Sequence, residues 1–160
     1  MFGFKKHKQT NELFSPIAGE IIDLSKVSDP VFAQGMMGEG FGIKPDLNDE
    51  EIVSPIGGVV TVAQGHAVGI TRDDGLEFLI HIGIDTVSLN GKPFNVLIKQ
   101  GKKVDIGTPL VEVDWQQIID QKLDPTVMIL ITNSKTNLES LDVNEQTVTK
   151  QVTIGQAIAK

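Results

Sequence analysis

The sequence predicts an all-β fold, an antiparallel β-sandwich or flattened barrel made of internally duplicated β-units with one or two short helices. Short segments rich in β-branched residues recur along the chain, and turn residues separate them, with 16 Gly and 7 Pro in total. The length of 160 residues and the 40% apolar content fit one domain with its own core. We therefore expect a flexible basic tail at residues 1–12 and a single domain at residues 13–160.

Turn signals separate the expected strands, most clearly at Asp73–Gly75 and Asn90–Gly91. The glycine-rich segment Gly38–Gly42 lacks the lysine and the following helix of a phosphate-binding loop, so we predict a turn there. Only Trp115–Lys122 has a helical pattern, with Asp114 as a candidate N-cap. The expected strands are Glu20–Ile22, Gly58–Val62, Leu76–Ile84, Pro109–Val113 and Val127–Ile131.

Two internal repeats predict related β-units that close on one core. The segment Ser15–Gly19 recurs as Ser54–Gly58 at an offset of 54 − 15 = 39 residues, and each copy opens an expected strand. The pattern V-x-I-G-x-x-aliphatic begins at Val104 and again at Val152, an offset of 152 − 104 = 48 residues. A glycine at this place suits a tight corner between strands.

Composition and charge exclude several classes of protein. The chain has no cysteine, which excludes a disulfide scaffold, a thiol nucleophile and a Cys-ligated zinc site. Its formal net charge of −7 argues against nucleic acid as the main partner, because phosphate binding needs clustered Lys and Arg. No apolar run is long enough to span a bilayer and no signal-peptide pattern opens the chain, so we expect a cytoplasmic protein.

His81 lies in the most apolar segment of the chain, where strand alternation assigns it a face. The residues expected to point into a core are Ile80, Ile82 and Ile84. The residues expected on the opposite face, with His81, are Leu79, Gly83 and Asp85. Because glycine has no side chain, Gly83 leaves room beside the His81 ring for a ligand or for a partner's backbone.

A hairpin turn at Asp73–Gly75 would bring a second histidine to His81. His66 precedes this turn, on an expected strand face that it shares with Gln64. Counting outward from the turn sets His66 opposite His81 or Ile82. Spacing alone therefore predicts that the two imidazoles meet.

Two neighbouring imidazoles suit phosphoryl transfer. A neutral imidazole is a nucleophile near neutral pH and can hold a phosphoryl group, while a second ring donates a hydrogen bond to the phosphoryl oxygens. Three other classes stay open. His81 and Asp85 could be ligands in a metal-dependent hydrolase, although such a site needs about three protein ligands. The duplicated units could form a swinging-arm carrier domain, although no lysine lies centrally in a symmetric turn, or both histidines could be structural residues of a binding module.

Several ordered motifs from about Leu13 onward resemble the glucose-type enzyme IIA family of the bacterial sugar phosphotransferase system. The signature around His81 is the longest of them. The resemblance implies a compact antiparallel β-sandwich that acts as a phosphocarrier. The motifs are Asp29–Gln34, Met36–Gly38, Ser54–Gly58, His66-Ala67, Gly75–Val87, Leu89–Gly91, Phe94 and Val104–Asp114.

The resemblance also implies a phosphorylated nucleophile and its partners. His81 would take a phosphoryl group on Nε2 from the phosphocarrier protein HPr and pass it to a cysteine of a IIB domain, which drives sugar uptake through a membrane IIC domain. His66 would support the phosphoryl group without carrying it. The chain has no transport domain, so we expect it to act on a separate membrane protein. Regulatory targets are a further class of expected partner.

The family's other site positions fall on acidic and apolar residues of this chain. Asp29 and Asp85 would lie close to the site, where negative charge raises the energy of the phosphorylated state and attracts an arginine of the donor. Gln64 stands where many members carry a threonine that orients the second histidine. The expected partner-docking residues are Val31, Phe32, Val62 and Leu79.

Zinc is a secondary expectation. In related proteins the two histidines can bind zinc when a partner supplies a carboxylate, so His66 and His81 are candidate zinc ligands. We expect that the transfer itself requires no cofactor. A regulatory or metal-binding module that uses the same histidine pair is the alternative function.

Overall fold

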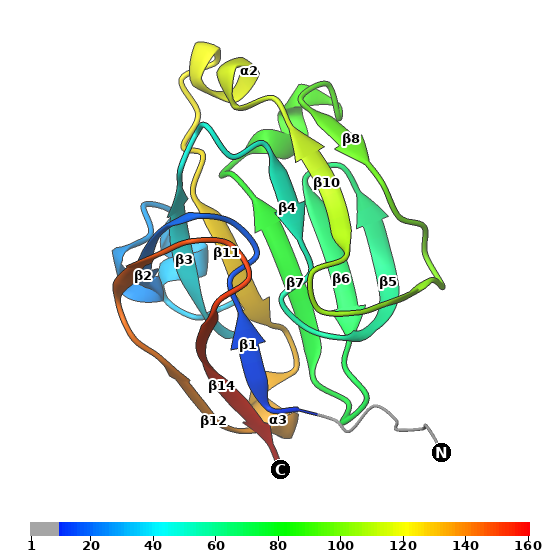
Figure 1. Cartoon of the computed structure of the whole chain (residues 1–160). Helices are drawn as coiled ribbons and strands as arrows, with labels where there is room; N and C mark the ends of the chain where they lie inside the picture. The colour runs from blue at the N-terminus through cyan, green and yellow to red at the C-terminus, as the bar shows by residue number, and fades with distance from the viewer. Residues whose placement is uncertain (1–9) are drawn as a thin grey trace.

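The structure is a computed structural model that describes residues 10–160. Its strands are β1 (Glu12–Phe14), β2 (Gly19–Asp23), β3 (Glu39–Pro45), β4 (Glu51–Val53), β5 (Gly58–Gln64), β6 (Ala67–Thr71), β7 (Glu77–Ile82), β8 (Phe94–Val96), β9 (Lys103–Val104), β10 (Pro109–Val113), β11 (Val127–Ile131), β12 (Leu138–Val143), β13 (Gln146–Val148) and β14 (Thr153–Ala159). They pair antiparallel into an eight-stranded sheet, β13-β2-β3-β11-β7-β6-β5-β9, and two three-stranded sheets, β1-β14-β12 and β4-β10-β8 (Figure 1). The sheets stay open, so the predicted all-β class takes the form of a sandwich.

Short helices lie between the strands, and they are more numerous than predicted. Helix α2 (Trp115–Asp120) lies where the sequence predicts a helix, and Asp114 is its N-cap residue, although the Asp114 side chain makes no capping hydrogen bond. The other helices of the described residues are α1 (Pro30–Ala33), α3 (Ser134–Asn137) and the 3-10 helices η2 (Leu24–Lys26) and η3 (Thr86–Leu89). Each spans only three or four residues, too few to leave a helical period in the sequence.

The predicted tail, residues 1–12, lies mostly outside the described residues. The description begins at Thr10, and Glu12 is already the first residue of β1, paired with Gln156. In the part of the chain from 10 to 160, no helix combines the length and the apolar composition needed to cross a bilayer.

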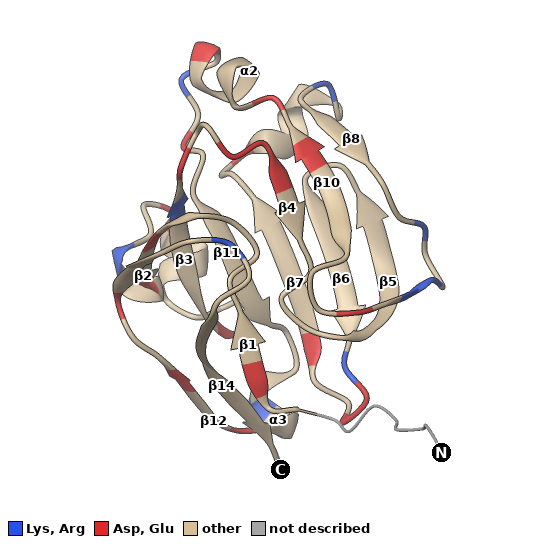
Figure 2. Ribbon diagram, viewed as in Figure 1, with Lys and Arg blue, Asp and Glu red and all other residues tan. Residues whose placement is uncertain are grey.

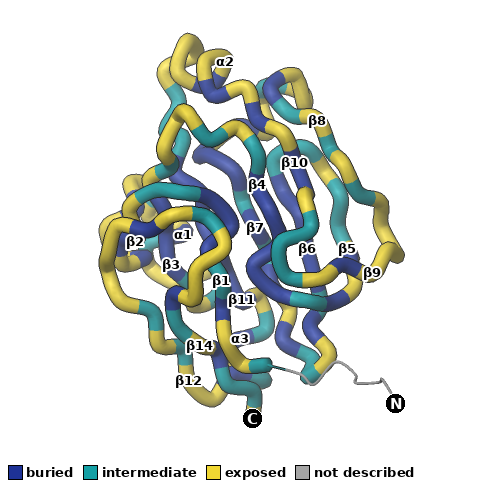
Figure 3. The backbone as a smooth tube through the Cα atoms, in the orientation of Figure 1, coloured by how far each residue is buried: buried dark blue, intermediate teal, exposed yellow. Residues whose placement is uncertain are grey.

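Two apolar clusters lie on the two faces of the eight-stranded sheet. The larger cluster fills the space between this sheet and the two small sheets and includes Ile80 and Ile129. Figure 3 shows β6 and β7 dark blue along much of their length. The smaller cluster lies on the other face, where Phe32 of α1 packs with Met128 and Leu130. Strand alternation thus divides the side chains of β7 and β11 between two clusters.

Most of the predicted strands are confirmed, and β10 and β11 match residue for residue. β7 is shorter than predicted, because it ends at Ile82. The predicted turn at Gly38–Gly42 is wrong, since most of this segment belongs to β3. A Cβ at Gly40 would lie 2.0 Å from the carbonyl oxygen of Ile129, so close approach of two backbones explains this glycine.

The first repeat is confirmed as two equivalent corners. In each copy a buried serine hydroxyl donates to a carbonyl two residues on, from Ser15 to Ile17 and from Ser54 to Ile56, at 2.6 Å in both cases. Backbone hydrogen bonds also join the two corners, from Phe14 to Pro55 and from Val53 to Pro16. The two units therefore meet at these corners.

The offset of the second repeat is wrong. The N–H of Gly107 donates to the carbonyl of Ser54, and the N–H of Gln151 donates to the carbonyl of Ser15, so Gln151 is the counterpart of Gly107. The true offset is 151 − 107 = 44 residues. Both residues have a positive φ, +88° and +64°, but only one copy uses glycine for it. The pairs Val104–Gly58 and Val148–Gly19 follow the same offset.

These equivalences divide the strands into two halves of seven. One half is contiguous in sequence, β4 to β10, and the other is split into β1 to β3 and β11 to β14. In the large sheet, the order of equivalent strands is the same when counted inward from either edge: β13, β2, β3 and β11 correspond to β9, β5, β6 and β7. The halves meet at the β7–β11 pair, where Ile80 faces Ile129.

Candidate functional site

The register of the large sheet gives His81 a small neighbour on one side. One row across the strands reads Gln64, Ala67, His81, Met128 and Gly42. The short side chain of Ala67, itself buried, separates His81 from Gln64 in this row. His81 is half-buried rather than enclosed in the core.

His66 lies in a tight turn, so the predicted strand that runs through it is wrong. β5 ends at Gln64, β6 begins at Ala67, and Gly65 and His66 form the turn between them. The predicted position opposite Ile82 is confirmed, because the N–H of Ile82 donates to the carbonyl of His66 at 2.7 Å. The two imidazole rings meet edge to face, with their centroids 5.4 Å apart.

A backbone hydrogen bond sets the tautomer of His81. Its Nδ1 lies 2.9 Å from the carbonyl oxygen of Gly83, and a carbonyl can only accept, so Nδ1 carries the proton. Nε2 then keeps its lone pair. The left-handed backbone of Gly83, with φ of +77°, follows directly on the end of β7 and allows its carbonyl to approach the ring.

β7 ends at Ile82, so the predicted alternation of faces stops there. Ile84, predicted to share one core face with Ile80 and Ile82, packs instead in the smaller cluster with Phe32. Asp85 is exposed, has a φ of +63° and is the N-cap residue of η3. Sequence reasoning assigned no role to Thr86, although it lies within the signature around His81. Its buried hydroxyl donates to the carbonyl of Ile82 and helps to hold this turn.

Burial favours the neutral form of both imidazoles. Burial is the largest influence on the pKa of His81 and lowers it below the ordinary 6.5, and the neighbouring His66 lowers it further. The Gly83 hydrogen bond and the charges of Asp29 and Asp85 raise this pKa but do not outweigh burial. Burial also lowers the pKa of His66. At neutral pH the Nε2 lone pair of His81 is therefore available as a nucleophile.

Helix α1 sets Phe32 against the ring of His81. Asp29 caps this helix, because its carboxylate accepts the backbone N–H of Val31 at 2.8 Å, and Pro30 is the first helical residue. The Phe32 and His81 ring centroids are 5.0 Å apart. Phe32 is only 9% exposed whereas Val31 is 43% exposed, so Val31 is the residue of this pair that a partner can reach.

The other two predicted docking residues lie beside the histidine row. A second row reads Val62, Gly69, Leu79, Leu130 and Gly40. Leu79 is two residues from His81 on β7 and so shares its face. Val62 and Leu79 are both partly exposed. Aliphatic side chains therefore border the site on this side.

The His66 ring is held by packing. Within residues 10–160 the ring makes no hydrogen bond, so Gln64 does not take over the orienting contact that the family's threonine makes. Gln64 itself is exposed at the end of β5. Across the same residues, no group of three His, Cys, Asp or Glu side chains lies close enough to hold a metal ion.

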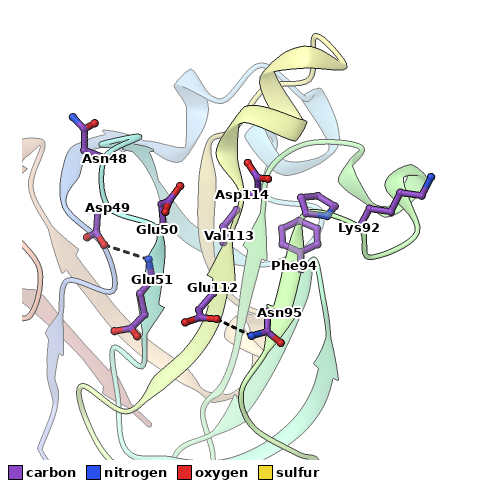
Figure 4. Close-up of a pocket in the computed structure, with 11 residues that line it drawn as sticks. Asn48, Asp49, Glu50, Glu51, Lys92, Phe94, Asn95, Glu112, Val113 and Asp114 are labelled. Atoms are coloured by element: carbon purple, nitrogen blue, oxygen red, sulfur yellow. Dashed lines mark hydrogen bonds between the residues drawn. The ribbon is translucent and has the colours of Figure 1, made fainter.

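An open groove lies elsewhere on the surface, and none of its described lining residues is a histidine. This groove of about 740 Å³ opens beside β4, β8 and β10, and Glu50, Glu112 and Asp114 line it together with Lys92 (Figure 4). Its carboxylates would repel a phosphoryl group. Figure 2 shows that β5 and β6, on either side of the turn that holds His66, carry no charged residue. The histidine pair, rather than this groove, is therefore the candidate place for phosphoryl chemistry.

Comparison with known proteins identifies the family. Residues 11–137 match the family described as phosphoenolpyruvate-dependent sugar phosphotransferase system, EIIA 1. The chain belongs to this EIIA family. EIIA proteins are phosphocarriers in sugar uptake, and two neighbouring imidazoles with an available Nε2 on His81 are consistent with that role.

Individual relatives support the EIIA assignment along the chain. The PTS system glucose-specific EIIA component of Staphylococcus epidermidis is 43% identical over 148 residues, covering 91% of this chain and 87% of that protein. The protein of the same name from Staphylococcus aureus is 43% identical over 137 residues, covering 84% and 81%. The solved glucose permease IIA from Mycoplasma capricolum is 32% identical with a TM-score of 0.80, over 97% of this chain and 98% of that one. This EIIA-family chain therefore has the sandwich fold of its solved relative.

Proposed function

We propose that His81 is the phosphorylated residue of this EIIA-family chain and that Nε2 carries the phosphoryl group. The observation that carries the proposal is the 2.9 Å hydrogen bond between Nδ1 and the carbonyl of Gly83. It leaves Nε2 as the ring nitrogen with a free lone pair, and the lowered pKa keeps that lone pair unprotonated.

Each transfer exchanges one bond to phosphorus for another. The Nε2 lone pair of His81 attacks the phosphorus carried on a donor histidine, the donor's N–P bond breaks, and its electron pair returns to the donor nitrogen. In the second transfer an acceptor thiolate attacks the same phosphorus, and the electron pair of the Nε2–P bond returns to His81. The bond from Nδ1–H to Gly83 stabilises the positive charge that the ring takes on while Nε2 holds the phosphoryl group.

The surrounding side chains act on the phosphoryl group in two opposite senses. His66, with its ring centroid 5.4 Å from that of His81, can donate a hydrogen bond to a phosphoryl oxygen, and the amide of Gln64 can do the same from the end of β5. Asp29 and Asp85, whose charges act on His81, raise the energy of the phosphorylated state. The result is a phosphoryl group that is held but readily passed on.

The donor in this proposal is HPr, and the acceptor is a cysteine of the IIB domain of a membrane sugar permease, both met in the cytoplasm. They use the same nitrogen in turn, so each must fit the aliphatic border of Val31, Val62 and Leu79. The relatives named above are glucose-specific, which makes glucose the sugar for a first test. A regulatory target that bound this face would compete with both partners.

Zinc could bind the same pair only with a partner's help. His66 and His81 offer two ring nitrogens, fewer than the roughly three protein ligands of a zinc site. Among residues 10–160 there is no third ligand close by. We propose that any zinc here is completed by a partner's carboxylate and is displaced when Nε2 of His81 is phosphorylated.

The test is phosphoryl uptake from phosphoenolpyruvate through enzyme I and HPr, read by intact mass. Wild type should gain one acid-labile phosphoryl group, and His81→Ala should gain none. His66→Ala should accept the group but pass it more slowly to a IIB domain. His7→Ala, which removes the remaining histidine, is the matched control and should behave as wild type. Phosphorylation of the His81→Ala protein would refute the assignment.

A further inference from the structure

We infer that Asp124 is a positioning residue for His81, an inference that rests on the function proposed above. Asp124 lies in the loop between α2 and β11 and does not contact the His81 ring. It acts through the Gly83–Ile84 peptide group: the backbone carbonyl of Asp124 accepts the N–H of this group, and Nδ1–H of His81 donates to its C=O. The structure links Asp124 to His81 by a continuous series of hydrogen bonds.

The first part of this series runs through the backbone. The N–H of Ile84 donates to the carbonyl of Asp124 at 2.9 Å, and the N–H of Gly83 donates to the carbonyl of Thr126 at 3.0 Å. The Ile84 N–H and the Gly83 C=O belong to one planar peptide group. The bond to Asp124 therefore sets the direction of the same carbonyl that accepts Nδ1–H of His81.

The second part holds the Asp124 loop itself in place. One oxygen of the carboxylate, Oδ1, accepts the backbone N–H of Thr126 at 2.9 Å and the Thr126 hydroxyl at 2.6 Å. Pro125 lies between them and fixes its own φ. Burial raises the pKa of Asp124, but these two hydrogen bonds, a third from Ser28 and the charge of Lys44 together outweigh it and lower the pKa, so the group is ionised at neutral pH. The loop is thus closed by a charged acceptor with two donors.

The third part ties the loop to the segment in front of His81. The other carboxylate oxygen, Oδ2, accepts the hydroxyl of Ser28 at 2.8 Å. Ser28 directly precedes Asp29, the N-cap of α1, and α1 carries Phe32 against the His81 ring. One carboxylate therefore connects two of the elements that contact His81, the Gly83 turn and helix α1.

The test compares Asp124→Ala with wild type by the ¹⁵N NMR signals of the His81 ring and by the rate of phosphoryl uptake from HPr. Wild type should show protonated Nδ1 and unprotonated Nε2. Asp124→Ala should show a mixture of the two tautomers and take up phosphate about tenfold more slowly, the order of effect known for outer partners of metal-binding histidines. Asp124→Asn keeps an oxygen that can accept from Thr126, so it should restore most of the wild-type tautomer and most of the wild-type uptake rate.

Two further variants keep the test decisive. Asp46, in the loop between β3 and β4, likewise accepts the N–H of the residue two positions on, Asn48. Asp46→Ala removes this carboxylate and should change neither readout. Ser28→Ala removes only the hydrogen bond to Oδ2 of Asp124 and should slow uptake by less than Asp124→Ala. If Asp124→Ala does not fold, Ser28→Ala tests the inference in its place. A wild-type tautomer and rate in folded Asp124→Ala would overturn the inference. A tautomer change in Asp124→Ala, with no phosphoryl uptake by wild type, would uphold the positioning role while the proposed function failed.

Discussion

The β2–β3 link and the β5–β6 link join equivalent strands in the two halves of the molecule, but they differ greatly in length. The first runs from Leu24 to Gly38, 38 − 24 + 1 = 15 residues, and folds into η2 and α1. The second is the two-residue turn of Gly65 and His66. The long link covers its part of the sheet with Phe32, and the short link leaves its part open.

The difference decides where chemistry can occur. Two rows of paired residues in the large sheet are equivalent when one is counted from the β2 side and the other from the β5 side. In order, they are Ile22, Gly42, Met128, His81, Ala67 and Val62, Gly69, Leu79, Leu130, Gly40. His81 and Leu130 therefore occupy equivalent places. Leu130 is fully buried under the long link, whereas His81 is half-buried at its edge and meets the histidine that the short link presents. One duplicated framework supplies a packing position and a reactive position.

The strongest test of this contrast compares Leu130→Ala with His81→Ala. Leu130→Ala should lower the free energy of unfolding by about 2 to 5 kcal/mol, because it leaves a cavity under the long link. His81→Ala should change it by about 1 kcal/mol or less, because the ring is half exposed, and should abolish phosphoryl uptake. Urea unfolding measures both. Equal losses of stability would contradict the division of roles between the two positions.

Gly83→Ala should have the next largest effect. Its φ is +77°, and a Cβ would lie 2.5 Å from the Thr86 methyl carbon, so the turn below His81 must shift. We expect a loss of about 2 kcal/mol from the left-handed conformation and the clash together. Gly91→Ala is the matched control, since Gly91 has the same φ of +77° and an added Cβ there would meet no atom within 4 Å. The unfolding free energies of the two variants should differ, and a match would show that the clash is relieved without cost.

Gly65→Ala tests the short link with a smaller effect. A Cβ at Gly65 would lie 3.0 Å from two carbons of Phe94, which must yield or push the turn outward. We expect a loss of about 1 kcal/mol and a slower transfer from His81 to a IIB domain, because His66 moves with the turn. Phe94→Leu in the same chain should recover part of both, which a double-mutant cycle measures. No coupling between the two sites would mean that Phe94 does not position His66.

The smallest expected effect is a shift in pH dependence. Because burial lowers the pKa of His81 below 6.5, the rate of phosphoryl uptake should fall on acidification with a midpoint below 6.5. The unfolded chain binds a proton near 6.5 before the folded one does, so this histidine makes the fold less stable as pH falls through that value and has no effect above it. Uptake and unfolding measured across this range check both signs. A midpoint above 6.5 would mean that the acidic neighbours outweigh burial.

The predicted strands β2, β5, β7, β10 and β11 could be recognised because each is a short segment rich in β-branched residues between turn signals. β3 could not, because its glycines imitate a turn. The histidine pair was predictable because a single hairpin, counted from Asp73–Gly75, sets His66 opposite Ile82. Helix α1 has its start signals in Asp29 and Pro30, yet a four-residue helix depends on the packing of Phe32, which only the folded sheet reveals. The positioning role of Asp124 could not be recognised, because the hydrogen bonds that join it to Ser28 and Ile84 link segments far apart in sequence.

The second repeat failed for a different physical reason. Gly107 marks its corner with a glycine, but the equivalent corner uses Gln151 in a left-handed conformation. Matching letters therefore aligned Gly107 with Gly155, which lies inside β14. The two halves share a backbone conformation at this corner but not the residue that usually signals it.

The insertion of one half within the other bears on how the chain folds. All pairings within β4 to β10 close within residues 51–113, whereas the other half must bring Gly19 to Val148 across the inserted segment. Closing a longer loop costs more chain entropy and slows folding. We expect amide protons of β5 and β6 to become protected earlier than those of β13 in a pulse-labelled refolding experiment, and simultaneous protection would argue for a single nucleus that spans both halves. On this route the strands on both sides of the histidine turn, β5 and β6, would pair before helix α1 closes over the neighbouring face.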